Sequence, residues 1–172
     1  MYFGNFELRT IAEGDQGIDQ TVAILERIYR DSIRDPRVIA FAQDLRARSG
    51  AANDEAVLAS LVLFIRSHLR FTRDPVGLEL VKTPDRLLSE LETRAVMIGD
   101  CDDASVLMAT LAGALGYPAR FVVVQRDTRS PTFDHIYVES WTGRSWVALD
   151  AVANGRQPFF RPTHVRIKVY SS

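Results

Sequence analysis

Apolar residues recur every three or four positions between residues 18 and 69, which is the spacing of amphipathic helices. A first helix is predicted over residues 18–33. Asp35 followed by Pro36 predicts a second helix that ends at Gly50, because aspartate caps helices and proline fits the first helical position. A third helix begins after Asn53 or Asp54. The apolar positions of the first and third helices are Val22, Leu25, Ile28, Tyr29, Ile33, Val57, Leu61, Phe64, Ile65 and Leu69.

A turn and a short helix follow. The sequence RDPVG at residues 73–77 combines aspartate, proline and glycine, which is typical of a turn. Thr83 then caps a short helix that Pro84 opens. We expect its inward face to consist of Leu87, Leu88 and Leu91.

The stretch GDCDDASVLMATLAGALGYP predicts a longer helix. Asp100 is a good cap, and Asp102 and Asp103 suit the positive end of the helix dipole. Gly116 stops the helix and Pro118 prevents its return. The side chains on its buried side are Leu107, Met108, Leu111, Ala114 and Leu115.

The remainder of the chain favours strands. ARFVVVQR is rich in β-branched residues, DTRSPTF is typical of a loop, and DHIYVESW and WVALDAV flank the tight turn TGRS. THVRIKVYS predicts one more strand. Helices followed by mostly antiparallel strands indicate an α+β fold in a single domain over residues 1–172. We expect a helical part over residues 1–70 and a core over residues 71–172.

Composition narrows the possible classes. The chain has 172 residues, 47% apolar and 25% charged, with a net charge of −1, which is typical of a soluble globular protein and gives no basic footprint for nucleic acid or membrane. A single cysteine excludes an internal disulfide and a zinc site with two thiolates. No signal peptide is evident, so a reducing cytoplasmic setting is expected, although a virion component would carry no such mark.

The hairpin predicts a pairing of chemical interest. If Trp141 and Trp146 pair across the turn, Asp150 lies opposite Tyr137 and one diagonal step from His135. Alternate residues of a strand share a face, and diagonal neighbours are within reach of long side chains. The simplest register therefore brings an imidazole and a carboxylate together.

The only cysteine, Cys101, begins the predicted long helix. A helix N-terminus stabilises a thiolate, a nearby histidine can take its proton, and an aspartate can orient that histidine. Nearby carboxylates oppose thiolate formation. We expect Asp100 to bend back toward the free N–H groups and Asp102 and Asp103 to point away from the sulfur; either of the latter two pointing at it would predict a poor nucleophile.

These segments resemble the transglutaminase-like superfamily, a variant of the papain-like cysteine-protease fold, in its bacterial and phage branch. The resemblance rests on GDCDDASVLMATLAGALGYPARFVVV, FDHIYVESW and WVALDAV, and covers roughly residues 71–151. It implies a nucleophile helix packed on an antiparallel sheet, with Cys101 as nucleophile, His135 as general base and Asp150 as orienting acid. Ala151 stands where many members have proline. The family's second oxyanion donor has no assigned counterpart here.

The resemblance implies a cysteine-dependent amide hydrolase or acyl transferase that acts on a peptide or protein side chain without a cofactor. Two alternatives are a non-enzymatic phage or prophage assembly module that keeps the fold and, less favoured, an arylamine-type acyl transferase. A hard-cation site made by Asp100, Asp102, Asp103 and His135 is a further alternative, but the block lacks the spacing of a calcium loop.

Three other features have structural interpretations. His68 lies on the predicted third helix and His164 lies near the end of the sequence, and both are interpreted as structural. Trp141 and Trp146 are expected to form a cross-strand aromatic pair, with a substrate-groove wall as the alternative.

Overall fold

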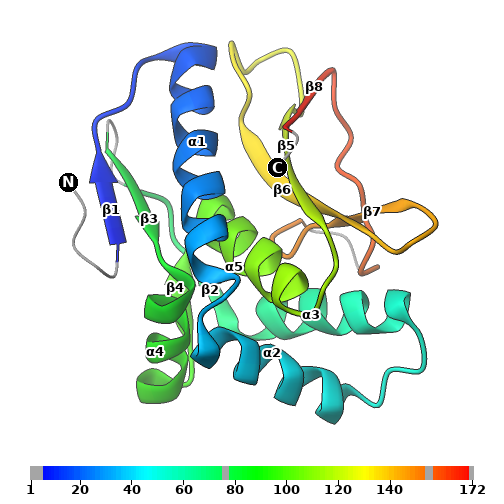
Figure 1. Ribbon diagram of the computed structural model, residues 1–172. Helices are drawn as coiled ribbons and strands as arrows, with labels where there is room; N and C mark the ends of the chain where they lie inside the picture. Colours follow the sequence, from blue (N-terminus) through cyan, green and yellow to red (C-terminus); the bar gives the residue numbers. More distant parts are fainter. Residues whose placement is uncertain (1–5, 75–77, 154–156, 171–172) are drawn as a thin grey trace.

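Helix α5 (Cys101–Ala114) lies at the centre of the computed structural model, which describes residues 6–74, 78–153 and 157–170 (Figure 1). Residues 103–112 are all buried. A helix that is apolar on every side must be enclosed by other elements. Here the helices α1–α4 and the strands β5 and β6 all pack against α5.

Four helices surround α5. The first begins at Gly14 rather than at the predicted residue 18 and has no side-chain cap, whereas the starts of the other three agree with the sequence signals. The bounds of the four helices are α1 (Gly14–Ser32), α2 (Pro36–Ser49), α3 (Asp54–His68) and α4 (Pro84–Arg94). The side chains of Asp35, Asn53 and Thr83 accept hydrogen bonds from backbone N–H groups in the first turns of α2, α3 and α4. The predicted caps are therefore confirmed. Of the predicted turn at 73–77, residues 75–77 lie outside the described residues.

A four-stranded antiparallel sheet, in the order β7-β6-β5-β8, covers one side of α5 (Figure 1). The strands are β5 (Ala119–Gln125), β6 (His135–Trp141), β7 (Trp146–Leu149) and β8 (Arg166–Val169). Gly116 has a φ of 88°, a left-handed conformation that glycine adopts without strain, so the chain can leave α5 and turn into β5. The predicted α+β arrangement, in which the helix that begins at Cys101 packs on an antiparallel sheet and additional helices precede it, is confirmed.

The two faces of this sheet have separate apolar clusters. Phe121, Val123 and Ile136 belong to the main core with α5, whereas Val122 and Tyr137 belong to a second, smaller cluster on the other face. This alternation follows from the period of two along a strand. Ile136 thus faces α5. The side chains of its neighbours His135 and Tyr137 leave the strand on the opposite face.

Four short strands were not predicted from the sequence. They are β1 (Phe6–Arg9), β2 (Leu69–Phe71), β3 (Glu79–Lys82) and β4 (Met97–Gly99). β1 pairs with β3 in antiparallel orientation, and β2 pairs with β4 in parallel orientation. β4 leads directly into α5, so the pairing of β2 with β4 holds the segment that precedes Cys101 in place.

None of the helices in the described part of the chain is long and apolar enough to cross a membrane.

Candidate active site

Cys101 is the first residue of α5, and local packing explains the residues around it. The Asp100 carboxylate caps the helix by accepting a hydrogen bond from the Asp102 N–H at 3.1 Å. A Cβ atom at Gly99 would lie 2.3 Å from Oδ2 of Asp103, a distance that real Cβ contacts do not reach. Glycine is therefore required before the cap because the Asp103 side chain folds back over it and accepts a hydrogen bond from the Lys82 N–H at 2.8 Å.

One cavity of about 220 Å³ brings the predicted residues together. Cys101 and Asp102 line it from α5, and His135 and Ile136 line it from β6. Thr21 of α1 and Glu79 of β3 complete its polar lining together with Asp134. The helix that carries the thiol and the hairpin that carries the imidazole thus meet at a common space.

His135 and Asp150 form a buried pair. Nε2 of His135 lies 2.6 Å from Oδ2 of Asp150, and the two residues are 7% and 1% exposed. The other carboxylate oxygen accepts hydrogen bonds from the N–H groups of Val152 and Ala153 at 3.0 and 2.9 Å. The carboxylate is held from both sides, and the ring atom that remains for proton transfer is Nδ1.

The predicted hairpin register places this pair. Trp141 pairs with Trp146, and Val138 pairs with Leu149 at the end of β7. Asp150 follows directly and reaches His135 across the diagonal, as the sequence predicts. A shift by one residue would turn one of the two side chains to the other face of the sheet.

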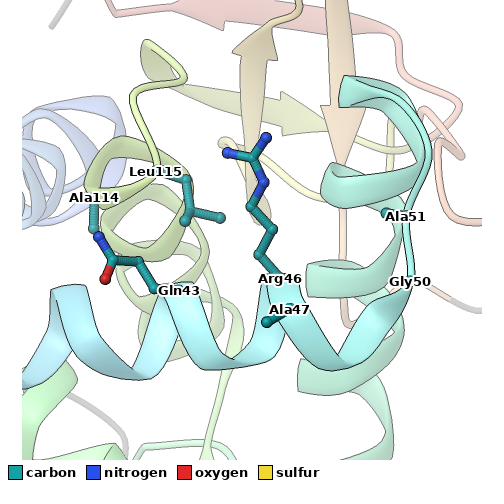
Figure 2. A pocket seen from close by; sticks show the side chains of 7 residues that line it. All are labelled: Gln43, Arg46, Ala47, Gly50, Ala51, Ala114 and Leu115. Atoms are coloured by element: carbon teal, nitrogen blue, oxygen red, sulfur yellow. The ribbon is translucent and has the colours of Figure 1, made fainter.

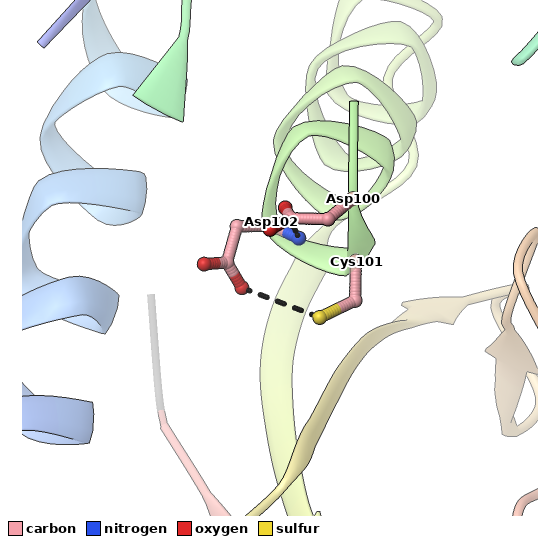
Figure 3. Close-up of side chains that lie close together, drawn as sticks. All are labelled: Asp100, Cys101 and Asp102. Carbon is pink, nitrogen blue, oxygen red and sulfur yellow. Dashed lines mark hydrogen bonds between the residues drawn. The ribbon is translucent and has the colours of Figure 1, made fainter. Parts of the chain in front are cut away.

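Asp102 approaches the sulfur, contrary to the sequence-based expectation. The Cys101 thiol donates a hydrogen bond to Oδ1 of Asp102 over 3.7 Å, and Figure 3 shows the carboxylate reaching from α5 toward the sulfur. Burial first, and then the charges of Asp102 and Asp100, raise the pKa of Cys101 well above its ordinary value. A hydrogen bond from the backbone N–H of Ile136 lowers the pKa of Cys101, but this effect is smaller. In this arrangement the thiol is neutral and a poor nucleophile.

The expectation failed for Asp102 alone. Asp100 bends back to the helix and Asp103 turns to β3, as their hydrogen bonds show. The side chain of Asp102 instead meets Glu79 of β3, and burial and this carboxyl neighbour raise its pKa well above the ordinary value. Two carboxyl groups that share a hydrogen bond must hold a proton between them.

The carboxylates also have the spacing of a cation site, but its members differ from those of the alternative weighed from the sequence. Ligand atoms of Asp100, Cys101 and Asp102 lie within 4.8 Å of one another. In the described part of the chain, neither Asp103 nor His135 joins this group. His135 is already bonded to Asp150, so the four-residue cation site that the sequence left as an alternative is not assembled.

A larger cavity, of about 460 Å³, lies between α2, the connection from α2 to α3, and the end of α5 (Figure 2). Arg46 is the charged side chain among its lining residues, and Gln43, Gly50 and Leu115 are among the others. It contains no nucleophile, acid or base from the predicted set. Size alone therefore does not identify the reactive site.

The remaining histidines and tryptophans lie elsewhere. Nδ1 of His68 contacts the Phe64 carbonyl at 2.9 Å, and Nδ1 of His164 contacts the Pro162 carbonyl at 3.0 Å. The two tryptophan rings pair with centroids 5.7 Å apart, at the end of β6 away from His135. The predicted aromatic pair is confirmed.

Sequence reasoning did not identify Thr21 and Glu79 as residues of this site. Both belong to elements upstream of the cysteine motif, one to a helix without a recognisable motif and one to a strand that was not predicted. No local pattern distinguishes either residue from an ordinary polar position.

Solved structures of two bacterial proteins share the fold. A predicted protease from Parabacteroides distasonis superimposes with a TM-score of 0.55 at 18% identity, and the match covers 76% of this chain and 26% of that chain. A predicted cysteine protease from Cytophaga hutchinsonii gives a TM-score of 0.55 at 16% identity over 82% of this chain and 48% of that chain. This chain therefore spans about a quarter and about half of these relatives. No curated protein matches it at a significant level.

The model of the transglutaminase-like superfamily matches residues 39–151, which is more than half of the chain. The match begins upstream of Phe71, where the resemblance seen in the sequence began, and takes in α3 and most of α2. The division of the domain at residue 71 stays a prediction. The family assignment agrees with the fold and with the cysteine motif at the start of α5: the chain belongs to the transglutaminase-like superfamily.

Proposed function

We propose that the protein is a cysteine-dependent amide hydrolase or acyl transferase in which Cys101, His135 and Asp150 act through an acyl-enzyme. The observation that supports this most is the buried His135–Asp150 hydrogen bond of 2.6 Å at a cavity that Cys101 also lines. Family membership and the protease names of the two similar structures support the same reaction class.

The residues have complementary roles in this proposal. Nδ1 of His135 takes the thiol proton as the Cys101 sulfur attacks an amide carbonyl carbon. The imidazolium then gives this proton to the nitrogen as the carbon–nitrogen bond breaks, which leaves a thioester. Water or an amine attacks the thioester, loses a proton to His135, and the thiol is restored. Asp150 stabilises the imidazolium and holds the ring.

Hydrolysis is favoured over transfer in this proposal, with a peptide or a protein side chain as substrate. The support is the protease naming of both similar structures. No step requires a metal or an organic cofactor, since all proton transfers have a side chain to perform them.

The first test is the rate at which iodoacetamide alkylates Cys101, measured against pH by intact-mass spectrometry. We expect the wild type to react at least about ten times faster at pH 7 than His135→Ala, because the imidazole can accept the thiol proton. His68→Ala is the matched control, since it removes a histidine that contacts the backbone of its own helix. Its alkylation rate should equal that of the wild type.

A peptide mixture then tests turnover. New termini or new amide links should appear with the wild type and not with Cys101→Ser. Fast, His135-dependent alkylation without any turnover of peptides or proteins would contradict a peptide substrate while leaving the thiol chemistry in place.

A binding or assembly module that keeps the fold is the second candidate. The observation in its favour is the thiol's hydrogen bond to Asp102, which keeps the sulfur neutral. Slow and equal alkylation of the wild type and His135→Ala would support this candidate and overturn the enzymatic one.

A further inference from the structure

Three hydrogen-bond acceptors from three different elements line the cavity beside the thiol. They are Thr21 of α1, Glu79 of β3 and Asp102 of α5. The rest of the lining is mainly apolar and includes Ile18 and Phe133. Ligand sites commonly combine apolar walls with a few polar groups that orient the ligand.

The Thr21 hydroxyl has no partner of its own. Thr21 is only 5% exposed, and within the described ranges its Oγ1 atom makes no hydrogen bond. A threonine in a helix can bond to a carbonyl one turn back, but this one does not. Leaving a buried hydroxyl unpaired costs free energy, so the position favours a ligand that supplies the missing hydrogen bond.

The Glu79–Asp102 pair, which holds one proton, carries a negative charge without a basic partner. In the part of the chain that the structure describes, no ion pair involves either carboxylate, and the two contact each other through a shared proton. Arg9 lies opposite Glu79 in the β1–β3 ladder, but its side chain pairs with Glu7 at 2.5 Å.

The third carboxylate of the cavity is already compensated. Asp134 lies 3.0 Å from Nε of Arg126 and accepts a hydrogen bond from the Arg126 N–H at 2.8 Å. The uncompensated charge of the cavity is therefore located at Glu79 and Asp102, on the side that α1 covers.

We propose that this cavity is a subsite for a primary ammonium group of the substrate, held by Glu79, Asp102 and Thr21. A primary ammonium has three N–H donors, which matches the three acceptors. Methylene groups next to the ammonium fit the apolar walls. The substrate class is thus a peptide with a lysine-like side chain or a free N-terminus next to the reacting carbonyl. This inference rests on the proposed function only for the role of the ligand as a substrate.

The bound ammonium would also act on the nucleophile. The charge of Asp102 opposes the thiolate, and an ammonium on the Glu79–Asp102 pair compensates this charge. The thiol is then more reactive with a cationic substrate bound than without one. In this arrangement, the carboxylate of Asp102 makes the reactivity of the thiol depend on the bound ammonium group.

Three iodoacetamides test the subsite without requiring turnover. Their N-substituents are a 5-aminopentyl chain, a neutral 5-hydroxypentyl chain, and a 5-(trimethylammonio)pentyl chain that has the charge but no N–H donor. Saturation kinetics of Cys101 modification are followed by intact-mass spectrometry. We expect the aminopentyl reagent to react at least about ten times more efficiently than each of the other two. A 2-aminoethyl reagent shows whether the ammonium group comes from a lysine-like side chain or from a free N-terminus. A site for lysine-like chains favours the longer linker, and a site for a free N-terminus favours the shorter one.

Variants assign the preference to the named residues. Glu79→Gln and Thr21→Val should each remove most of the preference for the aminopentyl reagent, whereas Thr21→Ser should keep it. Glu55→Gln is the matched control, because it removes the same charge at an exposed position on α3 and should keep the preference. Ratios between reagents cancel any general change in thiol reactivity.

Several results would overturn the subsite. Equal efficiencies of the charged and neutral reagents would exclude it, and a quaternary reagent as good as the primary one would show only a general electrostatic attraction. A thiol that none of the reagents modifies would show that the cavity admits no ligand to the sulfur. If unsubstituted iodoacetamide shows the His135 dependence without any ammonium preference, only this inference fails. If the ammonium preference appears without the His135 dependence, the subsite is supported and the proposed reaction is refuted.

Discussion

Asp102 is the charged side chain that contacts the thiol. It lies next to Cys101 in the chain, accepts the thiol hydrogen bond and contacts Glu79 on the other side. A carboxylate in this position opposes the negative charge that a nucleophilic sulfur needs. In the ammonium subsite proposed above, the reactive and resting states differ in how the charge of Asp102 is compensated.

The variant Asp102→Asn tests this role. It keeps the size of the side chain and removes the charge, so the pKa of Cys101 should fall toward its ordinary value. We expect unsubstituted iodoacetamide to alkylate Cys101 about three to ten times faster at pH 7 than in the wild type, as the thiolate fraction rises. Asp44→Asn, an exposed position on α2, is the control and should have no effect. An unchanged or slower rate in Asp102→Asn would show that this charge does not limit the thiol.

At the scale of elements, Glu90 of α4 connects the strands that lead into the site. It is 5% exposed and accepts hydrogen bonds from the Ile98 N–H of β4 at 3.1 Å and from Nε of Arg86 at 3.1 Å. Nζ of Lys82 on β3 lies 3.3 Å from the same carboxylate. Since β4 runs into Gly99 and Cys101, this carboxylate supports the start of α5.

Replacement of Glu90 by alanine should therefore be costly. It leaves the Lys82 charge and the Ile98 N–H without this carboxylate partner, and a broken buried pair typically costs about 3–5 kcal/mol. We expect Glu90→Ala to lower the free energy of unfolding in urea by about 2–4 kcal/mol. Glu92→Ala changes a residue on the same helix as Glu90, removes an exposed ion pair with Arg37 of α2, and should cost less than about 1 kcal/mol. Equal losses in the two variants would refute the role of Glu90.

At the scale of the whole molecule, the start of α5 makes stability depend on pH. Burial raises the pKa of Asp100 to about 6 and raises the pKa values of Asp102 and Asp103 in the same direction. A carboxyl group whose pKa is higher in the folded state binds its proton more tightly there. Its contribution is complete below the unfolded pKa, near 3.8, and is lost as pH rises through the folded pKa.

The free energy of unfolding should accordingly fall between pH 4.5 and pH 7. For Asp100 alone we expect a loss of about 1–3 kcal/mol over this window, and Asp100→Asn should flatten the curve because asparagine caps a helix as well as aspartate does. Urea titrations at several pH values measure this. Asp127→Asn is the control, because Arg129 lowers the pKa of Asp127 to about 2 and its effect lies below the window. A rise in stability from pH 4.5 to pH 7 would contradict the prediction.

The sequence by itself determined the features that depend on neighbours along the chain. The caps Asp35, Asn53, Thr83 and Asp100 act within one helical turn, and the register of the β6–β7 hairpin depends on a tight turn and the paired tryptophans. The His135–Asp150 contact follows from this register, which is why residue spacing was enough to predict it.

Only the tertiary structure decided what surrounds the thiol. Asp102 could point away from Cys101 or toward it, and the position of Glu79 on a neighbouring strand accompanies the second choice. Thr21 joins the cavity because α1 packs on α5, which no local pattern specifies. Short strands such as β3 and β4 are defined by partners distant in the sequence. Side-chain orientation in a buried site depends on contacts between elements, and these exist only once the chain has folded.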